Sequence, residues 1–108
     1  MISVTIIKHD KCYKEIHLDG HAKFAKFGKD IVCSAVSVLV INTINSIEEF
    51  TDDAFSGEAA ENGGRLDVVF PEELSHDSIL LLDSMVLGLK TIQKDYGSKY
   101  ISLQCKEV

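Results

Sequence analysis

Apolar and polar side chains alternate along two stretches near the start of the chain. In residues 2–8, Ile2, Val4 and Ile6 alternate with polar positions, and in residues 12–19 Ile16 and Leu18 alternate with charged ones. A period of two is typical of a strand with one buried face. A polar turn separates the two stretches, so we expect a two-stranded hairpin.

Residues 31–47 follow a different pattern, with no charged side chain and almost no polar face. A helix that is apolar nearly all round belongs in the middle of a domain, packed on several sides. Asp30 is suited to cap its first turn, so we expect a helix from residue 31 to about 49. Polar residues interrupt the run short of the roughly 18 apolar residues of a membrane span, which favours a core helix. These interrupting residues are Asn42, Thr43, Asn45 and Ser46.

The second half of the chain predicts a strand, a helix and a strand. Residues 51–64 are acidic and glycine-rich and predict an exposed loop. Residues 65–70 form a short apolar run stopped by a proline. Ser75 is a good cap for an amphipathic helix that closes at Tyr96-Gly97, and residues 100–105 predict a last strand that buries Cys105. The expected fold is one α+β domain over residues 1–108, a two-layer sandwich of two helices on about four strands.

Composition narrows the possible partners. The 108 residues suit a single domain, and the net charge of −6 without a basic run argues against nucleic acid and favours a basic peptide or protein. The N-terminus has no signal-peptide pattern. Three cysteines without C-x-x-C spacing do not predict a disulfide framework, so we expect free thiols in a reducing cytoplasm.

His21 and Cys33 are the candidate chemical residues. A cysteine in the first turn of a helix is favoured as the thiolate, and a nearby histidine could serve as general base and then acid. The free amides of that turn could form an oxyanion hole. Ser37 shares the helix face of Cys33, and Asp30 could orient the histidine instead of capping the helix. A buried packing cysteine and a surface histidine remain the open alternative.

A metal or cofactor is not expected. His17 and His21 on one strand would lie about 13 Å apart, too far to share an ion. Glycine patterns of nucleotide sites are absent from the sequence. Two other classes of function stay open, namely a binding module that docks on a ribosome or a partner, and a redox-sensing thiol at Cys33 with Cys12 or Cys105 as resolving partner.

The order of these motifs resembles a known family. The segments GHA (20–22) and DIVC (30–33), with Gly28 between them and Ser37 after them, are similar to the signature of the bacterial ribosomal-processing cysteine proteases. Chain length, element order and the glycine pair before the third strand are similar too. The resemblance covers essentially the whole chain, and the paired segments are far more specific than one cysteine and one histidine.

The resemblance implies a cysteine endopeptidase without a cofactor. It would remove the N-terminal extension of a large-subunit ribosomal protein, the twenty-seventh of its series, by cutting after a phenylalanine. His21 would be the base and Cys33 the nucleophile, while Gly20, Asp30 and Ser37 would bind substrate or support the site. A homodimer is also implied, and residues 22–29 would order over bound substrate. Apart from the resemblance, we expect exposed apolar positions of the second helix to form the dimer interface.

Overall fold

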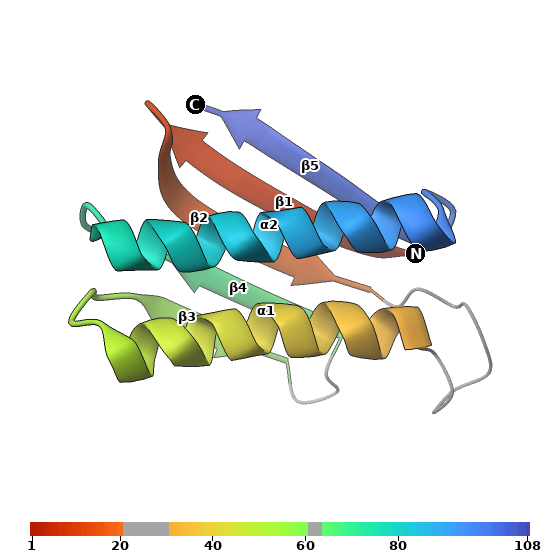
Figure 1. Cartoon of the computed structure of the whole chain (residues 1–108), viewed down its shortest axis with the longest axis horizontal. Helices are drawn as coiled ribbons and strands as arrows, with labels where there is room; N and C mark the ends of the chain where they lie inside the picture. The colour runs from red at the N-terminus through yellow and green to blue at the C-terminus, as the bar shows by residue number, and fades with distance from the viewer. Residues whose placement is uncertain (21–30, 61–63) are drawn as a thin grey trace.

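The computed structural model describes residues 1–20, 31–60 and 64–108, which form two helices on one face of a five-stranded sheet (Figure 1). This arrangement confirms the expected two-layer α+β sandwich. The elements in chain order are β1 (Ile2–His9), β2 (Cys12–Asp19), α1 (Ile31–Phe50), β3 (Ser56–Ala59), β4 (Arg65–Val69), α2 (His76–Tyr96) and β5 (Ile101–Glu107).

The sheet has the strand order β3-β4-β2-β1-β5. The pairs β1–β2, β2–β4 and β3–β4 are antiparallel, whereas β1 and β5 run parallel. Alternation places one side of each central strand against the helices. The fully buried side chains Val4, Ile6 and Ile16 lie on this inner face and anchor the core.

α1 contributes one buried stripe rather than a helix buried on every side. Its buried residues recur at three- and four-residue steps, and they are Val32, Val36, Val40, Thr43, Ile44 and Ile47. The expectation of packing on several sides was wrong, because Val38 is 67% and Ile41 49% exposed. The polar residues within α1 were also expected to rule out a membrane span. By length and composition alone, however, α1 is apolar enough to cross a membrane. A core helix passes the same test, and the buried stripe packs into the core.

α2 begins at the predicted cap. The Ser75 hydroxyl accepts from the backbone N–H of Ser78 at 3.4 Å. The Asp53 carboxylate in turn accepts from the Ser75 N–H at 3.0 Å, from the Ser75 hydroxyl at 2.6 Å and from the buried Ser78 hydroxyl. The Ser75 and Ser78 hydrogen bonds lower the pKa of Asp53. This acidic residue therefore fixes the start of α2 to the segment that follows α1.

Two sequence expectations were wrong in detail. Residues 56–59, expected within an exposed loop, form the edge strand β3, whose four residues are all exposed and therefore show no buried alternation. Cys105, expected to be buried, is exposed. It lines an open cavity of about 420 Å³ with Tyr13 and Lys90, because α2 leaves this corner of the inner face uncovered.

The two helices contact each other closely at Gly88. A Cβ atom built on Gly88 would lie 2.7 Å from Cδ2 of Leu39, so a larger residue in α2 would displace this side chain of α1. The contact covers the flank of α1 that carries Leu39. The flank with Cys33, Ser37 and Ile41, which recur every four residues, therefore faces away from α2 and toward the β3–β4 side of the sheet.

Candidate active site

Cys33 is the third residue of α1 and is half-buried against the hydrophobic core. It thus lies in the first turn of a twenty-residue helix. The backbone N–H groups of a first turn have no partner within the helix, and the helix dipole favours negative charge there. The backbone N–H groups of this turn can therefore donate to an oxyanion.

Gly20 fixes the end of β2, from which the chain continues to His21. Its backbone N–H donates to the Gly64 carbonyl at 2.9 Å, which ties the end of β2 to the segment before β4. Its φ is +90°, and a Cβ atom there would lie only 2.6 Å from the Met1 carbonyl oxygen. Glycine is thus required at this position for two separate reasons.

The end of β2 and the beginning of α1 lie toward the same end of the molecule (Figure 1). This arrangement brings the described ends of the two predicted motif segments, Gly20 and Cys33, to one region of the fold. His21, Asp30 and the predicted closing segment 22–29 lie outside the described residues. Of the predicted site residues, the described ones are therefore Gly20, Cys33 and Ser37.

Ser37 is half-buried one helical turn after Cys33 and lines a cavity of about 300 Å³ between α1 and the sheet. Ile41 and Ile44 continue the same wall along α1. Opposite them, Leu18 of β2 and Leu66 of β4 form the sheet side. The sequence predicted that Ser37 shares the face of Cys33, but it gave no sign that a hollow follows that face.

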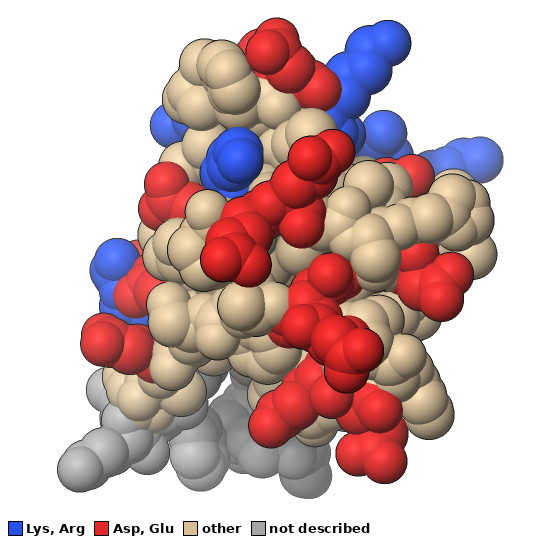
Figure 2. All heavy atoms as spheres, turned by 90° about the vertical axis from the view of Figure 1, so that its left-hand side faces the viewer, with Lys and Arg blue, Asp and Glu red and all other residues tan. Residues whose placement is uncertain are grey.

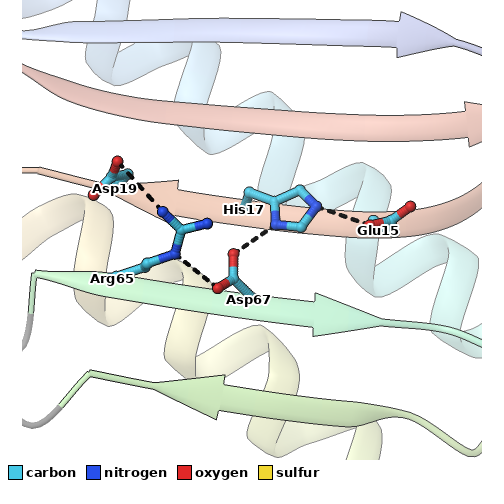
Figure 3. Close-up of polar contacts among 5 residues, drawn as sticks. All are labelled: Glu15, His17, Asp19, Arg65 and Asp67. Carbon is cyan, nitrogen blue, oxygen red and sulfur yellow. Dashed lines mark hydrogen bonds and ion pairs between the residues drawn. The ribbon is translucent and has the colours of Figure 1, made fainter.

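A row of charged side chains crosses the outer face of the sheet from β2 to β4 (Figure 3). His17 lies between two carboxylates, with Nδ1 2.6 Å from Asp67 Oδ1 and Nε2 2.9 Å from Glu15 Oε1. Arg65 donates from Nε to the other Asp67 oxygen at 2.9 Å and pairs with Asp19 at 3.8 Å. We call these five residues the β2–β4 charge row.

The charge row shifts the pKa values of His17 and Asp67 in opposite directions. The hydrogen bond that His17 donates to Asp67 is the main cause that raises the pKa of His17. The hydrogen bonds from Arg65 and then His17 lower the pKa of Asp67. The outward positions 15, 17 and 19 of β2 were visible in the alternation, but their partners on β4 depend on the strand pairing and could not be read from it. Among the residues that the structure describes, no group of three His, Cys, Asp or Glu side chains is arranged to hold a metal ion.

Comparisons of sequence and of structure with known proteins point to the same family of proteases. The family model for cysteine protease Prp matches residues 1–102. The ribosomal processing cysteine protease Prp of Bacillus subtilis is 34% identical, over 89% of this chain and 90% of that protein. The Staphylococcus aureus protein of the same name is 29% identical, over 90% and 92% of the two chains.

Solved structures agree over the whole fold. The S. aureus ribosomal processing protease Prp with a covalently linked product peptide superposes with a TM-score of 0.92 at 29% identity, covering 98% of this chain and 100% of that one. The same protease with a substrate peptide gives a TM-score of 0.86 at 27% identity, with the same coverage. From the family match, the relatives and the shared fold, we conclude that this chain belongs to the Prp family of cysteine proteases.

Proposed function

We propose that this protease removes the N-terminal extension of a large-subunit ribosomal protein, the twenty-seventh of its series, by cutting after a phenylalanine. The relatives are named ribosomal processing proteases, which supports a ribosomal substrate. The observation that carries the proposal here is the half-buried Cys33 in the first turn of α1. A thiol at this position lies in the favourable field of the helix dipole and beside backbone N–H groups that can stabilise an oxyanion.

In the proposed mechanism, Cys33 and His21 act as a dyad. The Cys33 thiolate attacks the scissile carbonyl carbon, and the amides of the first turn of α1 stabilise the resulting oxyanion. His21 then gives its proton to the leaving amine, and the C–N bond breaks to leave a thioester on Cys33. His21 next takes a proton from water, whose hydroxide attacks the thioester and releases the new carboxyl end together with the Cys33 thiolate.

Gly20, Asp30 and Ser37 have supporting roles in this proposal. The constrained backbone of Gly20 gives the following residue, His21, a fixed starting point. Asp30 caps α1 or orients the imidazole of His21. Ser37, one turn beyond Cys33, lines a cavity beside α1, which supports a role in contacting the peptide.

We further propose that the enzyme works in the cytoplasm as a homodimer. All three cysteines, which lie in the described part of the chain, are thiols rather than disulfides, which suits a reducing compartment. On α2, Leu80 and Leu87 are 59% and 68% exposed and lie seven residues apart, on one face of the helix. Exposed apolar side chains of this kind suit an interface between two copies. Sedimentation of Leu80→Lys should then yield monomers.

The test is cleavage of a peptide that spans the extension, its phenylalanine and the first residues after it. Wild type should cut after the phenylalanine, as read by mass spectrometry, whereas Cys33→Ala and His21→Ala should reduce kcat/KM by at least about a thousandfold. Cys105→Ala is the matched control, because it removes an exposed thiol elsewhere. A folded wild type that leaves the peptide intact would contradict the proposed substrate, and full activity of His21→Ala would contradict the dyad.

A further inference from the structure

A second cavity, with a volume of about 420 Å³, lies between α2 and the strands β1 and β5. Ile6 of β1 and Cys105 of β5 pair with each other in the sheet, and both line this cavity. Ile6 is fully buried whereas Cys105 is exposed, so the cover that α2 gives the inner face ends between these two positions. The cavity is thus a hollow at the margin of the hydrophobic core that opens to solvent.

This cavity is separate from the proposed active site. Asp19, the last residue of β2, pairs with Ser3, whereas the cavity begins at Ile6 and continues to Lys8. At about 3.3 Å per residue, these two positions lie about 10 and 17 Å along β1 from Ser3. None of the described residues that line the cavity comes from α1, the helix that carries Cys33. A ligand bound here would therefore leave the proposed active site accessible.

Two ammonium groups line this cavity. Lys8 comes from the sheet and Lys90 from α2, so they approach it from different layers of the fold. Nζ of Lys8 lies 4.5 Å from the centroid of the Tyr13 ring, which holds the lysine beside the cavity. Among the described lining residues the single carboxylate is that of Asp83, which accepts a hydrogen bond from the Tyr13 hydroxyl at 2.6 Å. The cavity therefore carries more positive than negative charge in a protein with a net charge of −6.

The remaining lining residues form an apolar wall. Ile6 and Val86 pack in or against the hydrophobic core, while Leu87 is 68% exposed, so part of this wall is in contact with water. Tyr13 is 3% exposed, and this burial, together with the hydrogen bond to Asp83, raises the pKa of its hydroxyl, which stays neutral. A volume of about 420 Å³ is within the range of small-molecule sites, roughly 300–1,000 Å³. The cavity thus offers an apolar surface beside two positive charges.

We propose that this cavity binds a small organic anion, with its apolar body against the wall and its acidic group between Lys8 and Lys90. Lysine acts as a point charge, so a carboxylate, a sulfonate or a phosphate would each satisfy the pair. The carboxylate of Asp83 disfavours a second acidic group, so a ligand with one anionic group fits best. Leu87 also belongs to the face of α2 proposed for the homodimer, and the cavity opens at the border of that face.

The probe for this site is anilinonaphthalene sulfonate, a dye whose rings carry one sulfonate. Phenylnaphthylamine has the same rings without the sulfonate and is the matched control ligand. Both dyes fluoresce more strongly in apolar surroundings, so a fluorescence titration gives Kd for each. Lys90→Glu reverses one charge of the cavity. Lys94→Glu is the matched control variant, because it makes the same change one helical turn later, at an exposed lysine that does not line the cavity.

Wild type and Lys94→Glu should bind the sulfonate dye with Kd values within about twofold of each other, and Lys90→Glu should bind it about tenfold more weakly, because repulsion replaces attraction. Binding of the uncharged dye should change by less than about twofold in both variants. Circular dichroism and melting curves establish that the variants fold as wild type does. An unchanged Kd of Lys90→Glu for the sulfonate dye would overturn the proposal, and so would an equal loss for both dyes.

Alkylation of the cysteines locates the bound dye. Cys105 lines the cavity and Cys12 does not, so the two thiols report on different places. Saturating sulfonate dye should slow the reaction of Cys105 with uncharged iodoacetamide by about fivefold or more, as peptide mass spectrometry measures it, because the dye restricts access to the thiol. Cys12 should keep its rate. Dye binding without protection of Cys105 would place the dye elsewhere and contradict the proposal, as would a wild type that does not bind the dye.

Discussion

At the scale of single residues, Gly20 follows the last residue of β2 and precedes His21, the proposed catalytic base. It combines a φ of +90° with a close approach to the Met1 carbonyl, and its N–H is engaged by Gly64. A side chain here would strain the backbone and push against the first strand at the same time. The position therefore couples the stability of the fold to the placement of the residue that follows.

We predict that Gly20→Ala lowers the free energy of unfolding by about 1–3 kcal/mol and reduces peptide cleavage at least tenfold. Urea denaturation and kcat/KM measure the two effects. Gly57→Ala is the control, because a Cβ atom there meets its nearest neighbours at an ordinary 3.8 Å. Equal stability of Gly20→Ala and wild type would show that the turn can adopt another conformation.

The role of a single residue could be predicted from the sequence where that role depends only on the helix or strand to which the residue belongs. Ser75 was predicted as the cap of α2 because a cap is defined by local backbone geometry, and the structure confirms it. Asp53 was not singled out, since its link to Ser75 and Ser78 joins residues more than twenty positions apart. The contact between His17 and Asp67 spans fifty positions and was missed for the same reason.

At the scale of elements, the β2–β4 charge row stabilises the strand pair that ends at Gly20. The raised pKa of His17 means that the folded protein holds its proton more tightly than the unfolded chain does. Its contribution to stability is therefore complete below the ordinary histidine pKa of about 6.5 and is lost as pH rises through the higher folded value. Asp67 has a lowered pKa, so it remains charged throughout this range.

We predict that His17→Gln destabilises the protein by about 1 kcal/mol at pH 5.5, and by less at pH 8.5, because the stabilisation by charged His17 declines as pH rises through its raised pKa. Urea midpoints at the two pH values give the comparison. His76→Gln serves as the control, because His76 lies on the exposed first turn of α2 and its side chain is 88% exposed. A loss for His17→Gln that is the same at both pH values would mean that charge plays no part in it.

The elements themselves were predictable to different degrees. The hairpin and α2 followed from periodicities that match their buried faces, whereas α1 was predicted from an uncharged apolar run. β3 could not be found in this way, because its four residues are all exposed. The structure defines this strand by its pairing with β4, which the residues of β3 alone do not reveal. For α1, apolar residues all round the helix wrongly predicted burial on several sides, because residues such as Val38 are apolar yet exposed.

At the scale of the whole molecule, negative charge is unevenly distributed. Figure 2 shows carboxylates running over the end of the molecule where α1 ends and α2 begins. The exposed residues of these segments include Glu48, Glu49, Asp52, Glu72 and Glu73. This surface lies at the end of α1 opposite Cys33, so a positively charged peptide at the proposed active site would be attracted mainly by the net charge of −6 of the whole protein, which salt screens.

We predict that kcat/KM for a peptide with a lysine-rich segment after the cut falls about three- to tenfold between 50 and 500 mM salt. The same peptide with its lysines replaced by glutamine should change by less than about twofold, and it is the control for general salt effects. Equal salt dependence of the two peptides would mean that attraction by the net negative charge of the protein does not assist binding.

The parallel pairing of β1 with β5 has a consequence for how the protein forms. Ile2 pairs with Ile101 and Lys8 with Glu107, so strands separated by almost the whole chain are neighbours in the sheet. Pairings this distant in sequence close large loops and slow the folding transition. During synthesis β1 can pair with β2 early, but it has to wait for the last strand of the sheet. Until then, one side of β1 offers unpaired backbone groups to other chains, so translation speed and chaperone access affect the yield of native protein.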